Sequence, residues 1–246
     1  MSSLIDAGDA RIFRFLARWT VIAGLVNLGL LLAFSIFVLP AAQNSPLPDD
    51  YIELVAASHS PALYRLTITL DLTAWLMLGG FFIALAAVLA RRAPLRATFL
   101  AACGIGQAVG LLGAFARLHG TSQLAAQYIT AVPDQQAALL QSYHDLQLFF
   151  TSAFGTGALL WGVALVLAAS IAWSMANFPR WLSGLIALPG IIELPKSVVQ
   201  IVTGADLGFL ILLELPLLIV AYFAVAAVFW RQAPARAPEM RSAPVS

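Results

Sequence analysis

Six long apolar runs in the sequence restrict the folds that are open to this chain. A helix needs about 20 predominantly apolar residues to cross the hydrocarbon core of a bilayer. The runs are continuous and rich in Leu and Ala, whereas strands of a membrane barrel alternate apolar and polar residues. The sequence therefore predicts an all-α, polytopic membrane helix bundle with six transmembrane helices, over Trp19–Leu39, Ala62–Ala90, Ala97–Leu118, Leu146–Trp173, Leu182–Thr203 and Gly208–Trp230.

The composition agrees with burial in lipid. Only 10% of the 246 residues are charged and 61% are hydrophobic, with a mean hydropathy of +0.90. Soluble domains carry about 25% charged residues, so this chain has too few charges to cover a water-facing surface. The expected partner is therefore the lipid bilayer. The net charge of +1 and the lack of a basic stripe give no reason to expect nucleic-acid binding.

The basic residues predict the orientation. Loops on the cytoplasmic side carry an excess of Lys and Arg. If the helices alternate in direction, ten of the thirteen basic residues fall on one side, namely Arg11, Arg14, Arg18, Arg91, Arg92, Arg96, Arg180, Arg231, Arg236 and Arg241. Both termini are then cytoplasmic (N-in/C-in), with a basic segment over residues 1–18, the membrane domain over 19–230 and a disordered tail over 231–246. The abundance of Ala, Leu, Arg and Pro suggests the cytoplasmic (inner) membrane of a bacterium.

Two longer loops, over residues 40–61 and 119–145, would then face the outside. Each contains a helix start signal, because Pro48 with two acids precedes Tyr51, and Pro133 with Asp134 precedes a polar helical run. A helix from Pro133 into the fourth span would be about 60 Å long, roughly twice the thickness of the hydrocarbon core. This helix must therefore project outward or bend, and we expect a bend near residues 142–145.

Seven charged residues fall within or at the ends of the spans. Each charge at the bilayer centre costs about 3 kcal/mol on insertion scales, so such residues face the bundle interior and pair with one another. The seven are Arg65, Asp71, Arg117, Asp145, Glu193, Lys196 and Glu214, and none of them falls in the inner half of a span. This asymmetry predicts a polar funnel that opens to the outside and closes toward the cytoplasm.

The fifth span combines charges with helix-breaking residues. Glu193, Lys196 and Gln200 share one helical face, and Glu193 and Lys196 are close enough in sequence to pair. Pro189-Gly190 and Pro195 predict interruptions, as in the broken helices that form transporter sites near the midplane. The predicted substrate-binding set comprises Arg65, Asp71, Arg117, His144, Asp145, Glu193, Lys196, Gln200 and Glu214.

No cofactor is predicted. His119, His144 and Asp145 map to the outer side and could bind a metal ion or haem, but they have no recognised ligand spacing. Three functions remain open: binding or transport of a small polar or charged solute or a lipid headgroup; a membrane-embedded metal-binding, haem-binding or enzymatic protein; and a non-catalytic accessory protein whose buried charges hold its helices together. The first needs no enzymatic chemistry and is the one that we favour.

Three short stretches resemble a known family. They are the basic entry into the first span from Arg18 to Leu25, the pair Arg65 and Asp71 six residues apart, and His144 followed by the turn from Phe178 to Gly184. In these features the chain resembles an uncharacterised bacterial family of six-helix membrane proteins, known only as a domain of unknown function. The resemblance implies the same fold over nearly the whole chain and draws attention to Arg65, Asp71 and His144.

Overall fold

The computed structural model describes residues 7–43, 47, 51–90, 93–174, 178–205, 207 and 210–232. These residues form helices and short connections, and no strand occurs among them. Six helical stretches are long and apolar enough to cross a membrane, namely Phe13–Ala41, Pro61–Ala87, Pro94–Tyr128, Pro133–Trp173, Arg180–Thr203 and Ile211–Arg231. The predicted six-span helical bundle is therefore confirmed. Most of the predicted tail, residues 233–246, lies outside the described residues.

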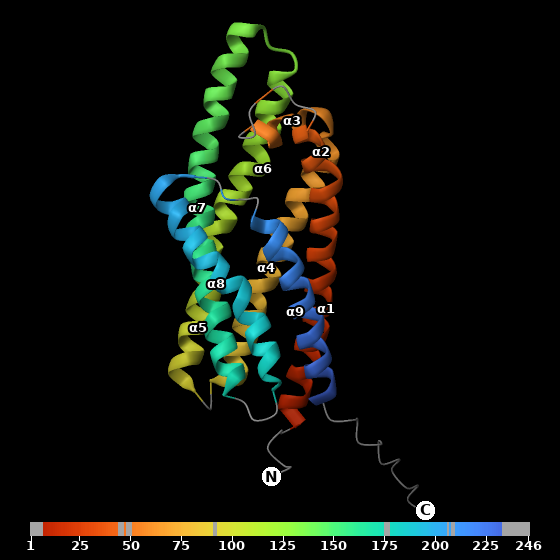
Figure 1. The fold of residues 1–246 in the computed structure, drawn as a ribbon, viewed down its shortest axis with the longest axis vertical. Helices are drawn as coiled ribbons and strands as arrows, with labels where there is room; N and C mark the ends of the chain where they lie inside the picture. Colours follow the sequence, from red (N-terminus) through yellow and green to blue (C-terminus); the bar gives the residue numbers. More distant parts are fainter. Residues whose placement is uncertain are drawn as a thin grey trace, which may run out of the picture.

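Figure 1 shows the order of the elements along the chain. They are α1 (Ala7–Ala33), η1 (Phe34–Val38), α2 (Leu39–Gln43), α3 (Ile52–His59), α4 (Pro61–Leu89), α5 (Pro94–Gly106), α6 (Ala108–Tyr128), α7 (Pro133–Trp173), α8 (Arg180–Thr203) and α9 (Ile211–Gln232). α1 already begins at Ala7, so residues 7–18 belong to the first helix, where Leu16 and Ala17 are fully buried. η1 is a π-helical turn just before Pro40, which has no N–H to donate to the preceding turn.

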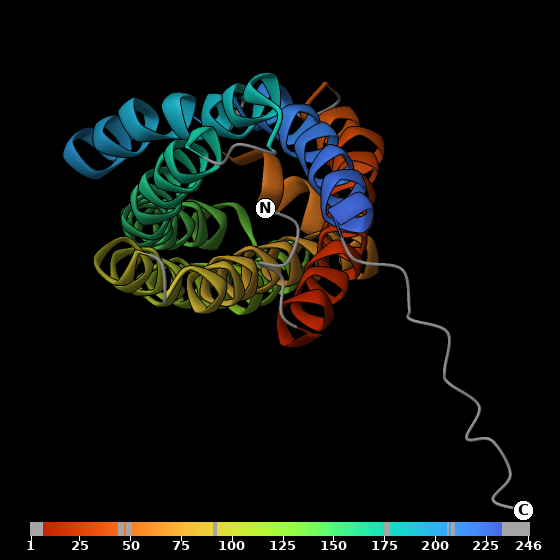
Figure 2. The same cartoon turned by 90° about the horizontal axis from the view of Figure 1, so that it is seen from below.

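The six spans form a ring. α1 packs on α4 and α9, α4 on α5, α6 on α7, α7 on α8, and α8 on α9, and the ring is visible along the bundle axis in Figure 2. α1 begins and α9 ends at the same end of the bundle, which we call the terminal end (Figure 1). At the opposite, distal end, the short helix α3 packs on α4 and α6.

Apolar side chains fill the terminal end of the ring. The largest core cluster includes Leu16, Phe82, Leu100 and Leu182, all fully buried. The indole N–H of Trp19 donates a 2.7 Å hydrogen bond to the Met77 carbonyl, which ties α1 to α4 at this level. The ring is therefore closed by packed apolar residues on the side of the chain termini.

The long loop predicted over residues 119–145 is mostly helical. α6 continues past Leu118 to Tyr128, and α7 begins at Pro133, so the two helices form a hairpin that projects beyond the distal end (Figure 1). α7 is helical without a break from Pro133 to Trp173, so the helix is not interrupted near residues 142–145, where a bend is expected from the sequence. This region holds no Pro or Gly, the usual causes of a kink.

The predicted interruption of the fifth span is wrong. α8 is helical from Arg180 to Thr203 and contains Pro189 and Pro195 within it. A proline removes one donor and crowds the turn before it, but packing against α7 and α9 holds the helix in place. α8 ends at Gly204, whose φ of 69° lies in the left-handed region that favours glycine at a helix C-terminus.

The third span consists of α5 and α6, which meet at Gln107 in a local tightening of the helix, because the Gly110 N–H donates to the Gln107 carbonyl while the Gln107 backbone stays helical (φ −61°, ψ −16°). The Gln107 side-chain amide donates a 2.9 Å hydrogen bond to the Trp75 carbonyl of α4. At this turn, Gly110 lies against Gly157 of α7. Small residues at such a contact let two helix backbones approach closely within a membrane.

This contact leads to a stability prediction. A Cβ added at Gly157 would lie 2.7 Å from the Gly110 nitrogen and 2.8 Å from the Gln107 carbonyl oxygen, so α6 and α7 would have to separate. We expect Gly157→Ala to lower the free energy of unfolding by about 1–3 kcal/mol. Gly184→Ala in α8 is the matched control, because nothing lies within 4 Å of its added Cβ. It should be neutral or stabilise by up to about 1 kcal/mol. Thermal unfolding in detergent measures both, and equal effects would contradict the close contact.

Candidate functional site

A cavity of about 710 Å³ lies inside the ring. It extends from Tyr51 and Glu53 below α3 at the distal end to Trp161 and Tyr222, where the apolar core of the terminal end begins. Seven of the nine predicted substrate-binding residues line it, namely Asp71, Arg117, His144, Glu193, Lys196, Gln200 and Glu214. These residues come from α4, α6, α7, α8 and α9. The cavity thus gathers charged side chains from four of the membrane-crossing helices and a histidine from a fifth.

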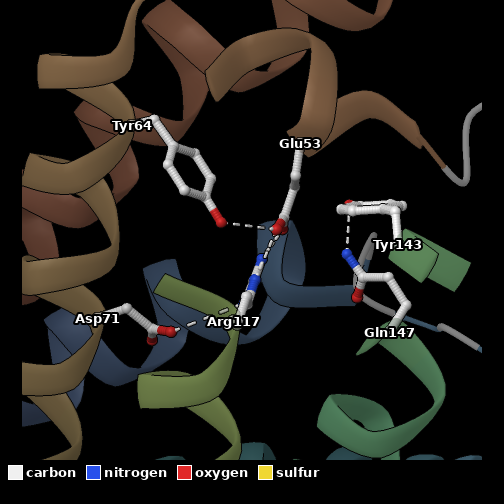
Figure 3. A network of polar contacts seen from close by, with 6 residues as sticks. All are labelled: Glu53, Tyr64, Asp71, Arg117, Tyr143 and Gln147. Atoms are coloured by element: carbon white, nitrogen blue, oxygen red, sulfur yellow. Dashed lines mark hydrogen bonds and ion pairs between the residues drawn. The ribbon is translucent and has the colours of Figure 1, made fainter. Parts of the chain in front are cut away.

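The distal part of the cavity is organised by Arg117, as Figure 3 shows. Its Nε donates a 2.6 Å hydrogen bond to Oε2 of Glu53, and its Nη2 pairs with Oε1 of the same carboxylate. Such a two-point contact fixes both direction and distance. The guanidinium group also lies 4.3 Å from the centre of the Phe150 ring. Arg117 of α6 therefore holds α3 through Glu53 and contacts α7 through Phe150.

Two further groups complete the cluster that we call the Arg117 cluster (Glu53, Tyr64, Asp71 and Arg117). The Tyr64 hydroxyl donates to Glu53 Oε2 at 3.4 Å, and Asp71 Oδ2 lies 4.0 Å from Arg117 Nη1. Asp71 points toward Arg117 from α4 in Figure 3. Its ion pair is at the limit of contact, whereas Glu53 is bound at two points. The carboxylate of Asp71, which lines the cavity, can therefore still bind a further partner.

The lower part of the cavity holds a second cluster, the Lys196 cluster (Glu193, Lys196 and Glu214). Lys196 Nζ lies 2.7 Å from Glu214 Oε2 on α9 and also pairs with Glu193, one turn earlier on α8. The predicted pairing of Glu193 with Lys196 is confirmed. Ser197 Oγ donates a 2.6 Å hydrogen bond to Glu193 Oε1. Side-chain exposure in this cluster is at most 5%, so the three charges are removed from bulk water.

Some buried acceptors in the cavity lining have no donor. Oε1 of Gln200 and Oε1 of Glu214 are both enclosed and have no hydrogen-bond partner among the described residues. Each residue is only 3% exposed, and both line the cavity. Leaving a buried polar atom unsatisfied costs about 1–3 kcal/mol. The side chains that line the cavity therefore include acceptors whose hydrogen bonds are not filled within the described part of the chain.

Two predicted substrate-binding residues lie elsewhere. Arg65 is exposed and does not line the cavity, because its six-residue separation from Asp71 places it on a different face of α4. Asp145 is also exposed, and its Oδ1 accepts a 3.0 Å hydrogen bond from Gln141 one turn earlier. The other metal candidate, His119, is exposed too. Within the described part of the chain, no group of three or more His, Cys, Asp or Glu side chains is arranged to hold a metal ion. His119, His144 and Asp145 therefore do not form such a group.

The prediction from sequence missed Glu53, the main partner of Arg117. Glu53 follows Pro48 and two acids, a pattern that indicates the start of a helix and gives no sign of an ion pair. The available signal was its setting, since it is the only charged residue between Tyr51 and Ser58 and it lies on the same helix as the fully buried Leu54. It also missed Tyr143, a buried cavity residue whose hydroxyl accepts a hydrogen bond from the Gln147 amide (Figure 3).

The Lys196 cluster leads to a second stability prediction. Lys196→Met would leave Glu193 and Glu214 buried without their cation, so we expect the protein to lose about 3–5 kcal/mol of stability. Glu214→Gln should cost clearly less, because Lys196 keeps its pair with Glu193. Thermal unfolding of the purified protein in detergent compares the two variants. A Lys196→Met protein that melts with the wild type would show that this ion pair does not hold α8 to α9.

Comparison with known proteins identifies the family to which this chain belongs. No curated protein and no solved structure matches this chain. A family model, described as Domain of unknown function (DUF4386), matches residues 22–230, which cover most of the first span, nearly all of the other five and both charged clusters. The resemblance inferred from the sequence motifs, to an uncharacterised six-helix membrane family, agrees with this match. The chain therefore belongs to the DUF4386 family of multi-pass membrane proteins.

Proposed function

We propose that this protein binds a small polar or charged solute in the cavity and carries it across the membrane. The observation that supports this most directly is the cavity itself, with about 710 Å³ of space among charged side chains of membrane-crossing helices. Small-molecule sites in proteins have volumes of about 300–1,000 Å³ and a few convergent polar groups in a mostly apolar wall. An accessory protein whose charges only joined its helices would have no need to keep this space open.

The proposed solute enters from the outside. The basic residues favour cytoplasmic termini in a bacterial inner membrane, and the cavity lies toward the opposite, distal end. α3 lies across that end and is joined to the wall by the contact of Glu53 with Arg117. In this proposal α3 is the outer gate, and the apolar core around Phe82 and Leu182 is the inner barrier.

In this proposal the Lys196 cluster holds the helices together, whereas Asp71 of the Arg117 cluster binds the solute. A variant of Asp71 tests this difference. Because its ion pair with Arg117 is at 4.0 Å, removing its charge should cost little stability. We expect Asp71→Asn to melt at or above the wild-type temperature, since binding sites often trade stability for function. The same variant should lose the thermal stabilisation that a panel of small amino acids, amines, organic acids and sugars gives the wild type.

Asp145→Asn is the matched control, because it removes an acid that does not line the cavity. It should keep the wild-type response to the panel. If Asp71→Asn instead melts far below the wild type, as expected for Lys196→Met, the charges of the cavity are structural and the accessory-protein alternative is favoured.

The orientation has its own test. Cys103 is the only cysteine and is buried, so a Cys103→Ala background provides a chain without thiols. Single cysteines are introduced by Gln135→Cys at the distal tip of α7 and by Arg231→Cys at the end of α9, and both positions are exposed. A membrane-impermeant maleimide added to intact cells should label the first and spare the second. The reverse pattern would place the termini and the inner barrier outside.

A further inference from the structure

We infer that the cavity is built for a solute that carries an ammonium group, and that Asp71 is the residue that receives it. This inference rests on the proposed solute-binding function and adds the chemical class of the solute. Three independent features of the cavity lead to it: the balance of charges, the unfilled hydrogen-bond acceptors and the aromatic walls.

The first feature is an excess of negative charge. The described residues that line the cavity include four carboxylates (Glu53, Asp71, Glu193 and Glu214) but only two permanent cations (Arg117 and Lys196). Each of these cations already contacts two of the carboxylates. An anionic solute would have to displace those pairs and enter a region of negative charge. A solute with one or two positive charges would instead restore the balance in a setting where charges are poorly screened.

The second feature is the kind of hydrogen-bonding atom left over. Gln200 Oε1 and Glu214 Oε1 are enclosed acceptors without a donor among the described residues. The carboxylate of Asp71, which has four lone-pair positions, has a charged partner only at 4.0 Å. A protonated amine supplies up to three N–H donors and no acceptor, so it matches this set. A carboxylate or phosphate group would instead add further acceptors to a site where the donors of Arg117 and Lys196 already contact carboxylates.

The third feature is the aromatic lining next to Asp71. Trp75 follows Asp71 by one turn on α4 and lines the cavity together with Phe154 and Trp161. The Trp75 ring centre lies 4.7 Å from that of Phe154 and 6.4 Å from that of Trp161. Faces of Trp and Phe attract cations, and indole does so most strongly. An ammonium group at Asp71 would therefore have a carboxylate on one side and aromatic rings on another.

A bare metal ion fits this site less well than an organic cation. Within the described part of the chain, the acids do not come together in a group that could hold a metal ion. Instead they are spread along a cavity with room for an organic molecule and with mostly apolar walls. The ammonium group could belong to a free amine or to the ethanolamine headgroup of a lipid, and the experiment separates these two sources.

The test uses the full-length protein in lipid nanodiscs and the fluorescence of its tryptophans, of which Trp75 and Trp161 line the cavity. The probes are ethanolamine and 1,4-diaminobutane, their uncharged counterparts ethylene glycol and 1,4-butanediol, and the dianion succinate. We expect a saturable change with the amines and none with the diols or succinate. In Asp71→Asn the apparent Kd for the amines should weaken by about tenfold or more, because a hydrogen-bonded ion pair is lost.

Two variants control for the state of the protein. Asp71→Glu keeps the charge and should retain amine binding, and Asp145→Asn lies outside the cavity and should bind like the wild type. Nanodiscs prepared with phosphatidylethanolamine or with phosphatidylglycerol as the major lipid show whether the ammonium group comes from a lipid headgroup or from a free amine. If a lipid headgroup is the ligand, phosphatidylethanolamine should occupy the site and abolish the response to free amines. If it is a free amine, the response should be the same in both lipids.

The outcomes separate this inference from the proposed function. Binding of a diol or of succinate that depends on Gln200 or Lys196, without binding of any amine in either lipid, would overturn the ammonium assignment and leave the solute site standing. Failure of every probe together with a large loss of stability in Asp71→Asn would overturn both. Amine binding that is unchanged in Asp71→Asn would overturn the assignment of Asp71 as the receiving residue.

Discussion

A charge in the hydrocarbon core of a membrane has no water to solvate it, and the rest of this structure depends on how six charges in one cavity solve that problem. Glu193, Lys196 and Glu214 lie almost wholly out of contact with water. Their hydration is replaced by one another and by the Ser197 hydroxyl, and the pair of Lys196 with Glu214 requires α8 and α9 to lie side by side in one register. Arg117 makes the same demand on α6 and on the short helix α3. The ring closes around these pairs, and apolar side chains fill its interior at the terminal end.

Each of the two clusters contains two carboxylates and one cation, but the clusters differ in how closely the cation contacts both carboxylates. The Lys196 cluster joins two long membrane-crossing helices and is sealed from water. In the Arg117 cluster the cation holds Glu53 at two points and Asp71 only at 4.0 Å, and Glu53 belongs to a helix of eight residues. α3 has four buried residues whereas α8 has nine, so less buried surface holds α3 in place. In the proposed function, α8 and α9 therefore form the fixed joint and α3 is the part that moves.

The sequence predicted those features that depend on local pattern. Length and hydropathy were enough for the six spans, and the three-residue spacing was enough for the pair of Glu193 and Lys196. Prediction from the sequence failed where a feature depends on residues that are far apart in the chain and meet only in the folded protein. Glu53 lies in a segment predicted as an outer loop, and only the folded position of α6 brings Arg117 to it. The assignment of Arg65 to the site is wrong for a local reason. Its depth in the second span is suitable, but it lies on an exposed face of α4.

Irregularities in the helices show the same division between local and distant causes. Prolines in the fifth span have a strong local effect, but α7 and α9 pack on either side of α8 and keep it helical. At Gln107 the only local signal in the sequence is the neighbouring glycines, yet the helix tightens there into a turn in which the Gly110 N–H donates to the Gln107 carbonyl. The Gln107 amide is bound to α4, and the backbone beside it lies against Gly157 of α7. Packing of α4 and α7 against this turn therefore accompanies the local change in the third span. Arg117 follows ten residues later on α6, so a shift of α6 at this turn would move the contact between Arg117 and α3, which is the outer gate in the proposed function.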